Sequence, residues 1–548
     1  MYGGFAAGIT GDEKGWCIMS INIMQWFAAL LPILVLLVLL LRCRWGGDEA
    51  ASAGLLCSIL TAYLVFGGGA DMIALAVAKG MWYSLSIILV VFPALIIYEV
   101  SRESGAFAVI RAGMQQFTPD KVLQVLAVGW IFVGFLQGIT GFGVPVVVGA
   151  PLLISMGVRP LTAVLITLLG QAWGNTFGTL GIAWDGLVSQ ADMSDPAVFR
   201  QAILWSTGML GVVNLIAGLL IAALAGGYSG MKRNAVTVIL LAVLQGAGQM
   251  GLALLNPMLC NFVVVSLSLG LIFAIGRLDY YRQPAELHDP AEEQQEELVT
   301  GNKMNIQQAF LPYFFLIVIA VVVLLNDSIK NYLGQWTLAL SFAGKTTSLG
   351  FETHSYAAYA PLAPLIHSGA FLLLAAIIGY LCYLQWGYIQ TGGMQRIIQN
   401  SLKKTIPSAI AVIGLIAMSK VMDETGQTTV LAQGVASVTG GIYPILSPFI
   451  GLLGTFMTSS NLSSNILFGG FQQKVALMLQ IDKAPLLAAQ TVGGSIGSII
   501  APSKILLGTT AAGILGREGE VISKVLVGAL LLCAVFGLVV FASYQFGW

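Results

Sequence analysis

Two short segments place glycine and small polar side chains inside otherwise apolar sequence. Residues 136–144 read LQGITGFGV, and residues 458–465 read TSSNLSSN. Glycine lets backbone amides approach a ligand closely, and hydroxyl and amide side chains can both donate and accept hydrogen bonds. A helix that begins after such a turn also directs free N–H groups toward an anion. The two segments therefore favour a binding site for a small acid with a carboxylate and a hydroxyl group.

The candidate binding residues come from these two segments and from the apolar stretches that follow them. They are Gln137, Thr140, Gly141, Gly143, Gln171, Asn175, Ser460, Asn461, Ser463, Ser464, Asn465, Ser503 and Lys504. The simpler interpretation is that small residues, Ser and Thr mediate tight helix packing in a membrane. That interpretation suits one isolated segment, whereas two segments at corresponding places in the chain favour a binding site.

Lys504, in the sequence APSKILL, is an ionisable residue well inside an apolar region. Such a charge is costly in hydrocarbon unless it is paired or hydrated. It could hold a carboxylate or lose its proton during transport, or it could extend to the membrane surface as an ordinary anchor. The charged residues at predicted span ends, among them Glu99, Glu103 and Glu424, are expected to be hydrated. Asp185 is expected in a loop, close enough to an interrupted span to hold a proton.

The composition of the whole chain indicates a membrane protein. Of 548 residues, 57% are hydrophobic and 9% are charged, against roughly 25% charged residues in a soluble domain. Lysine plus arginine and aspartate plus glutamate balance at 25 each, which excludes a basic surface for nucleic acid. Six cysteines and three histidines are too dispersed for a disulfide framework or a metal site. Neither a hydrolase motif nor a Walker A motif is present, so we expect no enzyme, no ATP-driven pump and no cofactor besides a coupling ion.

About 20 mostly apolar residues span the hydrocarbon core of a bilayer. The sequence predicts such spans at 21–41, 50–66, 81–98, 201–224, 236–255, 258–275, 310–325, 362–384, 406–419 and 525–541. Two further apolar regions, 127–183 and 442–515, are interrupted by glycine, proline and small polar residues. A polar, acidic linker at 276–308 separates a first half, 1–275, from a second half, 309–548. The sequence does not predict the structure of the long connection at 326–360.

The two interrupted regions are related in sequence. ESGAFAVIRAG at 103–113 corresponds to ETGQTTVLAQG at 424–434, and three further matching pieces follow in the same order. The chain therefore contains an internal duplication, with cores at about 99–184 and 420–515, and the positive-inside rule places the two copies in opposite orientations. The predicted fold is an all-α polytopic membrane protein with two inverted repeats, each with a re-entrant hairpin and a discontinuous transmembrane helix.

At these residues the chain resembles the L-lactate permease family of bacteria and archaea. The resemblance extends through most of the length and is densest in GFLQGITGFGVPVVVGAPLLISMGVRPL, NTFGTLGIAW, FMTSSNLSSNILF and TVGGSIGSIIAPSKI. It implies proton-coupled uptake of lactate, glycolate or a related 2-hydroxy acid across the cytoplasmic (inner) membrane. The family commonly has Glu where this chain has Gln137 and Asp where it has Asn461, so amides replace two potential proton carriers. Lys504 adds a positive charge beside Ser503, which should make the site more attractive to an anion.

The predicted function is secondary active transport of L-lactate or a closely related short-chain 2-hydroxy carboxylate. The expected mechanism is ion-coupled symport by alternating access, with the proton as the expected coupling ion. The alternatives keep a transporter but change the substrate to a sulfonated or dicarboxylic acid, or the coupling ion to sodium. An intramembrane enzyme would need catalytic motifs that the sequence lacks, and saturable uphill uptake would exclude a passive channel. The expected partners are the substrate and the lipid bilayer, with homo-oligomerisation left open.

Overall fold

The computed structural model describes residues 22–43, 45–141, 143–291, 304–353, 355–390 and 392–546. Within these residues, ten helices are long and apolar enough to cross a membrane, or eleven if the bent pair α13 (Leu311–Leu325) and α14 (Asp327–Leu333) is one span. The predicted all-α polytopic membrane fold is therefore confirmed. The inverted orientation of the two copies stays a prediction.

The first half begins with three long helices and a short one. These are α1 (Ile23–Leu41), α2 (Gly47–Leu64), α3 (Ala70–Glu103) and α4 (Ala106–Gln116). Asn22 caps α1 by accepting a hydrogen bond from the backbone N–H of Met24. Gly105, with φ of 76°, lets the chain turn between α3 and α4. Because α3 has 34 residues, it extends well beyond the predicted span at 81–98 at both ends.

The first interrupted region is followed by two long elements. Its parts are α5 (Lys121–Leu126), a π-helical turn (Ala127–Phe132), α6 (Val133–Ile139), α7 (Val144–Ser155), α8 (Pro160–Ala172) and α9 (Gly178–Gln190), before α10 (Pro196–Leu255) and α11 (Pro257–Ile275). The chain breaks between α6 and α7 and again between α8 and α9. The α10 element joins the predicted spans 201–224 and 236–255 and bends at Gly227, whose φ of 64° suits glycine.

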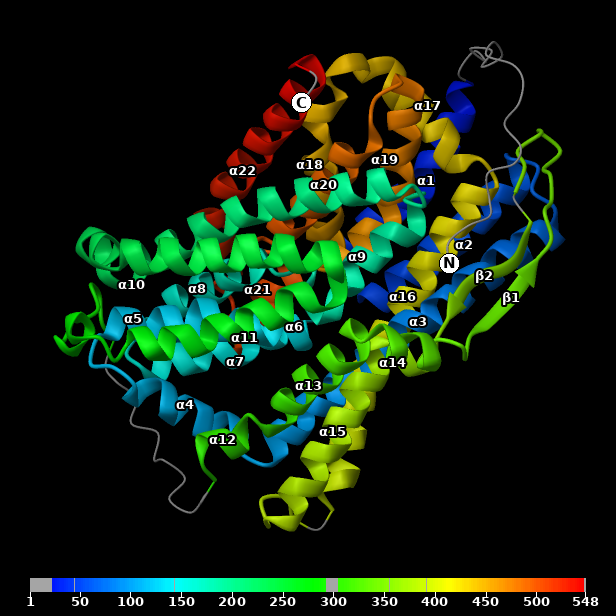
Figure 1. Cartoon of the computed structure of the whole chain (residues 1–548). Coiled ribbons are helices and arrows are strands. Elements are labelled where there is room, and N and C mark those ends of the chain that lie inside the picture. The colour runs from blue at the N-terminus through cyan, green and yellow to red at the C-terminus, as the bar shows by residue number, and fades with distance from the viewer. Residues whose placement is uncertain are drawn as a thin grey trace.

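The second half repeats this order of breaks. It comprises α12 (Ile306–Ala309), α13, α14, β1 (Leu338–Phe342), β2 (Tyr356–Leu362), α15 (Ser368–Gln385), α16 (Gly393–Glu424), α17 (Gln427–Thr439), α18 (Tyr443–Thr458), α19 (Asn461–Leu479), α20 (Lys483–Gly497), α21 (Pro502–Ala511) and α22 (Glu518–Phe546). The chain breaks between α18 and α19 and between α20 and α21. Both interrupted regions thus contain two helix–break–helix units, and Figure 1 shows the α18–α22 group packed beside the α5–α11 group.

The described part of the predicted linker lies against the first half. The Lys121 N–H donates to the Ala285 carbonyl at 2.9 Å, and the Ala291 N–H donates to the Gly157 carbonyl at 2.8 Å. Arg159 forms an ion pair with Asp289. Residues 276–291 therefore pack against both the α4–α5 turn and the α7–α8 turn and hold them together through these contacts.

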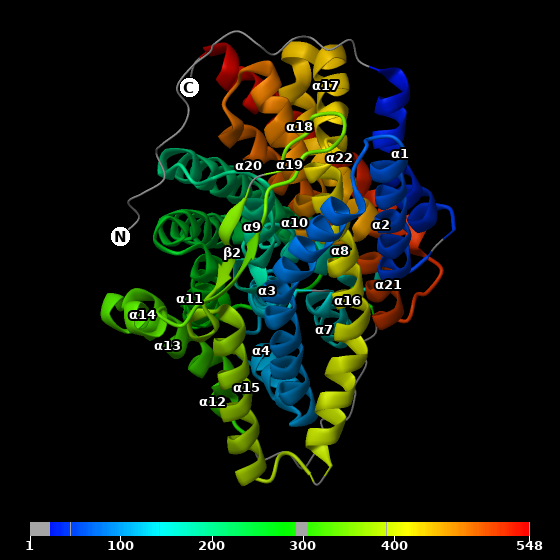
Figure 2. The same ribbon diagram turned by 90° about the vertical axis from the view of Figure 1, so that its right-hand side faces the viewer.

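Helices α3 and α16 pack along their length in opposite directions (Figure 2). Ion pairs close both ends of this contact: Lys79 with Glu424 at 2.9 Å, and Glu99 with Lys404 at 2.7 Å. Glu99 is 1% exposed and also pairs with Arg102. The expectation of hydrated charges at these ends is therefore wrong for Glu99, because the length of α3 keeps its side chain inside the bundle.

The connection at 326–360 forms an antiparallel β-hairpin from β1 and β2, seen beside α2 and α3 at the right of Figure 1. The Trp82 indole N–H donates to the Tyr359 carbonyl at 3.1 Å. The rings of Phe342 and Tyr356 lie 5.9 and 5.2 Å from the Lys79 ammonium group. The hairpin therefore covers the buried ion pair between Lys79 and Glu424.

Replacing Lys79 by Met should leave the Glu424 carboxylate without its cation. Removal of one partner from a buried ion pair typically costs about 3–5 kcal/mol, so we expect a clearly lower unfolding temperature of the detergent-solubilised protein. The double variant Lys79→Met/Glu424→Gln should recover most of that loss. As a control, Lys345→Met, which breaks an exposed pair with Asp71, should change the unfolding temperature little. Equal effects of Lys79→Met and Lys345→Met would contradict the buried role.

Candidate substrate-binding site

A small polar cavity lies where the breaks of the two interrupted regions meet. Its volume is about 50 Å³, enough for a few water molecules. The lining residues are Gln137, Gly141, Asn175, Gly178, Thr179, Ile182, Ala183, Ser459, Ser460, Asn461, Leu462 and Lys504. The cavity is thus shared by both copies. The first contributes α6, the α6–α7 break, the α8–α9 break and α9, and the second contributes the α18–α19 break, the start of α19 and α21.

Local backbone conformation explains why these breaks have the residues they do. Gly141 and Gly143 adopt φ of 56° and 82°, in the left-handed region that glycine enters without strain. A Cβ atom at Gly141 would lie 2.4 Å from the Thr179 hydroxyl oxygen. The α8–α9 break continues through Thr179 and Leu180, which are themselves left-handed, with φ of 49° and 53°. The two breaks of the first copy therefore fit against one another only because position 141 has no side chain.

Lys504 supplies the positive charge of the cavity. Its side chain is buried at 5% exposure, and its ammonium group donates to the Asn175 side-chain oxygen at 2.9 Å. The Asn175 amide group in turn donates to the Ser498 hydroxyl at 2.9 Å. No carboxylate forms an ion pair with Lys504 among the described residues. The ammonium group faces the cavity, as a ligand for an anion would, and does not extend to the membrane surface.

A second polar network joins the two copies behind the cavity. The Thr176 hydroxyl lies 2.8 Å from the Ser495 hydroxyl and 3.0 Å from that of Thr491. The Asn461 amide group donates to Thr176 and Ser495, each at 3.2 Å. Asn465 donates to the Thr491 hydroxyl at 2.9 Å. These contacts hold the start of α19 against α20 and the α8–α9 break.

Gln137 has unused hydrogen-bonding capacity at the cavity. It is 4% exposed, and its side-chain oxygen is buried without a partner among the described residues. The oxygen and nitrogen positions of such an amide are assigned from its surroundings, so either atom could face the cavity. A buried amide without a partner is costly unless a ligand or water completes it. Gln137 is therefore well placed to bind a hydroxyl group.

The structure places the other candidate residues around the cavity but not in its lining. The Thr140 hydroxyl donates back to the Leu136 carbonyl at 2.9 Å, and Gly143 begins α7. Gln171 lies fully buried in α8, and both polar atoms of its side chain lack a hydrogen-bond partner in the described part of the chain.

In the second copy, five candidates have structural partners, among them Ser460 of the cavity lining. Ser460 accepts a hydrogen bond from the Ser463 N–H and so caps α19, while the Ser464 hydroxyl donates to the Gly451 carbonyl at 2.8 Å. Asn465 also donates to the Ala183 carbonyl at 2.8 Å. Ser503 is exposed, and its N–H donates to the Ser459 hydroxyl at 3.2 Å.

Sequence reasoning missed Thr179 and Asn261. Thr179 lies in the segment NTFGTLG, whose small residues could have indicated the break. Asn261 lies in α11 beside the same break: a Cβ atom at Gly138 or Gly174 would lie 3.1 Å from its amide group. Its two polar side-chain atoms are buried and form no hydrogen bond with any residue that the structure describes. No sequence signal singles out Asn261, because it occurs inside an ordinary apolar span.

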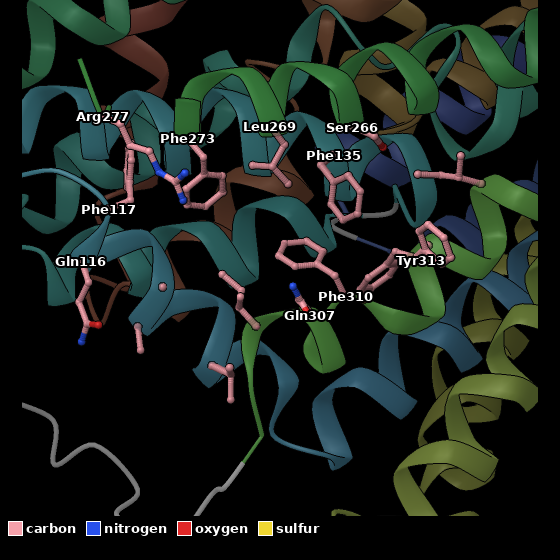
Figure 3. A pocket seen from close by; sticks show the side chains of 17 residues that line it. Gln116, Phe117, Phe135, Ser266, Leu269, Phe273, Arg277, Gln307, Phe310 and Tyr313 are labelled. Atoms are coloured by element: carbon pink, nitrogen blue, oxygen red, sulfur yellow. The ribbon is translucent and has the colours of Figure 1, made fainter. Parts of the chain in front are cut away.

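A larger groove of about 800 Å³ lies elsewhere, between α4, α11 and the α12–α13 segment. Figure 3 shows Arg277 at one end beside Phe117 and Phe273, with Phe310 and Tyr313 toward the other end. Its lining is mainly apolar and contains no candidate residue. A small charged ligand needs polar partners, so the smaller cavity is the better candidate despite its size.

Comparison with known proteins identifies the family of the chain. The model of the L-lactate permease family matches residues 25–546. The chain belongs to the L-lactate permease family. The L-lactate permease of Halalkalibacterium halodurans is 27% identical over 94% of this chain and 95% of its own length. The glycolate permease GlcA of Escherichia coli K12 is 27% identical over 93% of this chain and 94% of its own length.

Among solved structures, the YdaH transporter of Alcanivorax borkumensis aligns over 96% of this chain and 99% of its own. The TM-score is 0.42, and the sequence identity is 14%. As a member of a permease family with ten candidate spans in its described residues, the protein is a multi-pass transporter of the inner membrane and not an enzyme.

The variant Gly141→Ala tests the fit between the two breaks of this permease. Holding a non-glycine residue in the left-handed region costs about 1–2 kcal/mol, and the new methyl group would also meet the Thr179 hydroxyl. We expect a lower unfolding temperature. Gly251→Ala, in α10 with no atom within 4 Å of the added Cβ, should be neutral or slightly stabilising. An unchanged unfolding temperature in Gly141→Ala would mean that the space between the two breaks can accept a methyl group.

Proposed function

We propose that this permease takes up L-lactate or a closely related short-chain 2-hydroxy carboxylate by proton-coupled symport with alternating access. The observation that carries the proposal is Lys504: a buried ammonium group, without a counter-ion among the described residues, that faces a small polar cavity. A buried charge requires a partner, and a carboxylate is the natural one. The names of the family relatives, L-lactate and glycolate permease, agree with such a substrate.

The remaining groups of the cavity suit the rest of a 2-hydroxy acid. The first turn of α19 begins at the cavity, with Ser460 as its cap, and a helix N-terminus favours negative charge. Gln137 offers an amide group for the substrate hydroxyl, and Ile182 and Leu462 offer apolar surface for a short carbon chain. The described residues of the cavity lining include one cation, which matches a monocarboxylate. A dicarboxylate would leave its second charge unpaired, so the structure favours the monoanion over that alternative.

The arrangement of the two copies supports alternating access. Helix α19 of the second copy packs against α9 of the first, and α21 packs against α7. The cavity lies between these contacts, so movement of one copy against the other would change which side of the membrane it faces. Broken helices that meet at a central site are the usual architecture of such transporters.

Purified protein in liposomes tests the substrate and the coupling ion together. We expect saturable accumulation of labelled L-lactate driven by an inward proton gradient and unaffected by a sodium gradient. If one proton accompanies each lactate, a gradient of about one pH unit should drive about tenfold accumulation, since about 1.4 kcal/mol is a factor of ten. Excess glycolate should compete and excess succinate should not. Accumulation that follows sodium, or competition by succinate and not glycolate, would favour the alternatives.

Replacing Lys504 by Gln should weaken substrate binding. Loss of a hydrogen-bonded charge partner costs about 1.5–3 kcal/mol, so KM for lactate should rise about 10- to 100-fold. Lys524→Gln, at an exposed position of α22, is the matched control and should leave KM unchanged. An unchanged KM in Lys504→Gln would remove this lysine from the substrate site.

A further inference from the structure

Asp185 is a half-buried carboxylate on α9 without a partner among the described residues. It was expected in a loop, but α9 continues to Gln190 and contains it. Its carboxylate forms neither an ion pair nor a hydrogen bond with any described residue; only its backbone carbonyl is used, as the acceptor for the Tyr83 hydroxyl at 2.9 Å. An unpaired charge of this kind is costly in a membrane protein and usually has a function.

The other carboxylates within the helix bundle contrast with Asp185. Glu99 pairs with Lys404, Asp120 with Arg233, and Asp423, Glu424 and Glu103 with Lys474, Lys79 and Arg396 respectively. One other partly buried carboxylate among the described residues, Asp48, lacks a partner, but it lies in the first turn of α2, where a helix favours negative charge. The middle of α9 gives Asp185 no such compensation.

The position of Asp185 connects it to the cavity. Ile182, three residues earlier on the same helix, lines the cavity, so both side chains project from similar faces roughly 4.5 Å apart along the axis. Residues Leu462 and Ile466 of α19 pack near this turn and are apolar. Asn465 of the same helix donates to the Ala183 carbonyl at 2.8 Å.

Two titratable groups approach this part of α9 from neighbouring helices. Tyr83 comes from α3. Lys420 comes from α16, and its ammonium group lies 3.4 Å from the Ser189 carbonyl, one turn beyond Asp185. Lys420 therefore contacts the backbone and not the carboxylate. At the start of α9, the backbone of Met258 in α11 lies close to Gly181.

Among the described residues, the cavity lining contains no carboxylate that could take a proton. Positions 137 and 461 are amides, and Lys504 is the one ionisable residue of the described lining. Lys504 must stay charged while it holds a substrate carboxylate. A proton that travels with the substrate therefore needs another group, and Asp185 is the unpaired one within a turn of the lining.

We propose that Asp185 is the binding site of the proton that accompanies the substrate, which rests on the proposed symport. The empty protein then carries Lys504 as a cation and Asp185 as an anion, with no net charge at the site. With substrate and proton both bound, Lys504 is paired with the substrate carboxylate and Asp185 is a neutral acid, again with no net charge. Substrate alone or proton alone leaves an uncompensated charge, which hydrocarbon penalises. This charge balance couples the two movements.

The variant Asp185→Asn, which cannot take up a proton, tests this assignment in proteoliposomes. Its lactate-loaded site is neutral without a proton, so exchange of labelled for unlabelled lactate should persist at close to the wild-type rate. Accumulation driven by a proton gradient should disappear. Asp192→Asn, at an exposed loop carboxylate near Lys483, is the matched control and should keep both activities. Asp185→Glu should keep gradient-driven accumulation.

Gradient-driven accumulation by Asp185→Asn at the wild-type level would overturn the proposal. Loss of exchange together with accumulation in the folded variant would also overturn it, since Asp185 would then be needed for binding or structure. Infrared titration of the purified protein gives a readout that does not depend on lactate: among the carboxylic-acid C=O bands that appear on acidification, one band of the wild-type protein should be absent in Asp185→Asn. If the wild-type protein exchanges no lactate, the proposed substrate fails, and this band still tests the proton site; its persistence in the variant would reject it.

Discussion

The interruption of helices inside the membrane is the constraint on which the rest of this structure depends. Each break leaves backbone N–H and C=O groups without helical partners, and hydrocarbon offers them none. The fold brings the breaks of both copies together, so that these groups face each other and a shared polar cavity. Ser460 caps α19, and the Ser459 hydroxyl accepts from the N–H of Ser503 at the start of α21. The arrangement that satisfies the backbone also creates a place where a small polar molecule can bind.

The distribution of charge separates the parts that hold the fold from the parts that bind ligands. Along α3 and α16, buried charges occur as pairs, such as Glu99 with Lys404 and Lys79 with Glu424. Around the cavity, Lys504 and Asp185 have no oppositely charged partner among the described residues. Paired charges fix one geometry, whereas unpaired charges can exchange partners during a cycle. The contrast gives a physical reason to assign structure to the first group and transport to the second.

Much of the fold could be predicted from the sequence, because the sequence signals for spans and breaks are local. Long apolar stretches predict spans, and glycines with small polar residues predict breaks, which is why six of the candidate residues line one cavity. These are Gln137, Gly141, Asn175, Ser460, Asn461 and Lys504. The others serve helix ends and packing nearby, which sequence spacing alone does not distinguish from ligand contact.

What sequence could not predict depends on contacts between distant segments. Glu99 was expected to be hydrated because hydropathy ends the span near it, but α3 continues and a lysine 305 residues away buries it. Asn261 gives no local signal, because its proximity to the α8–α9 break arises only from packing. The β-hairpin at 338–362 likewise forms over Lys79, a partner far from it in the chain.

The antiparallel contact of α3 with α16 limits how this transporter can move. Its ion pairs lie near opposite ends, and between them Gly80 sits so close to Ala417 that an added Cβ would lie 2.5 Å from the Ala417 Cα. Sliding one helix past the other by a turn would separate the pairs at both ends together and drive side chains into a gap that only glycine fits. The α3–α16 contact therefore holds the two helices in one position relative to each other. In the proposed alternating-access mechanism, the interrupted helices that surround the cavity would then be the parts that move.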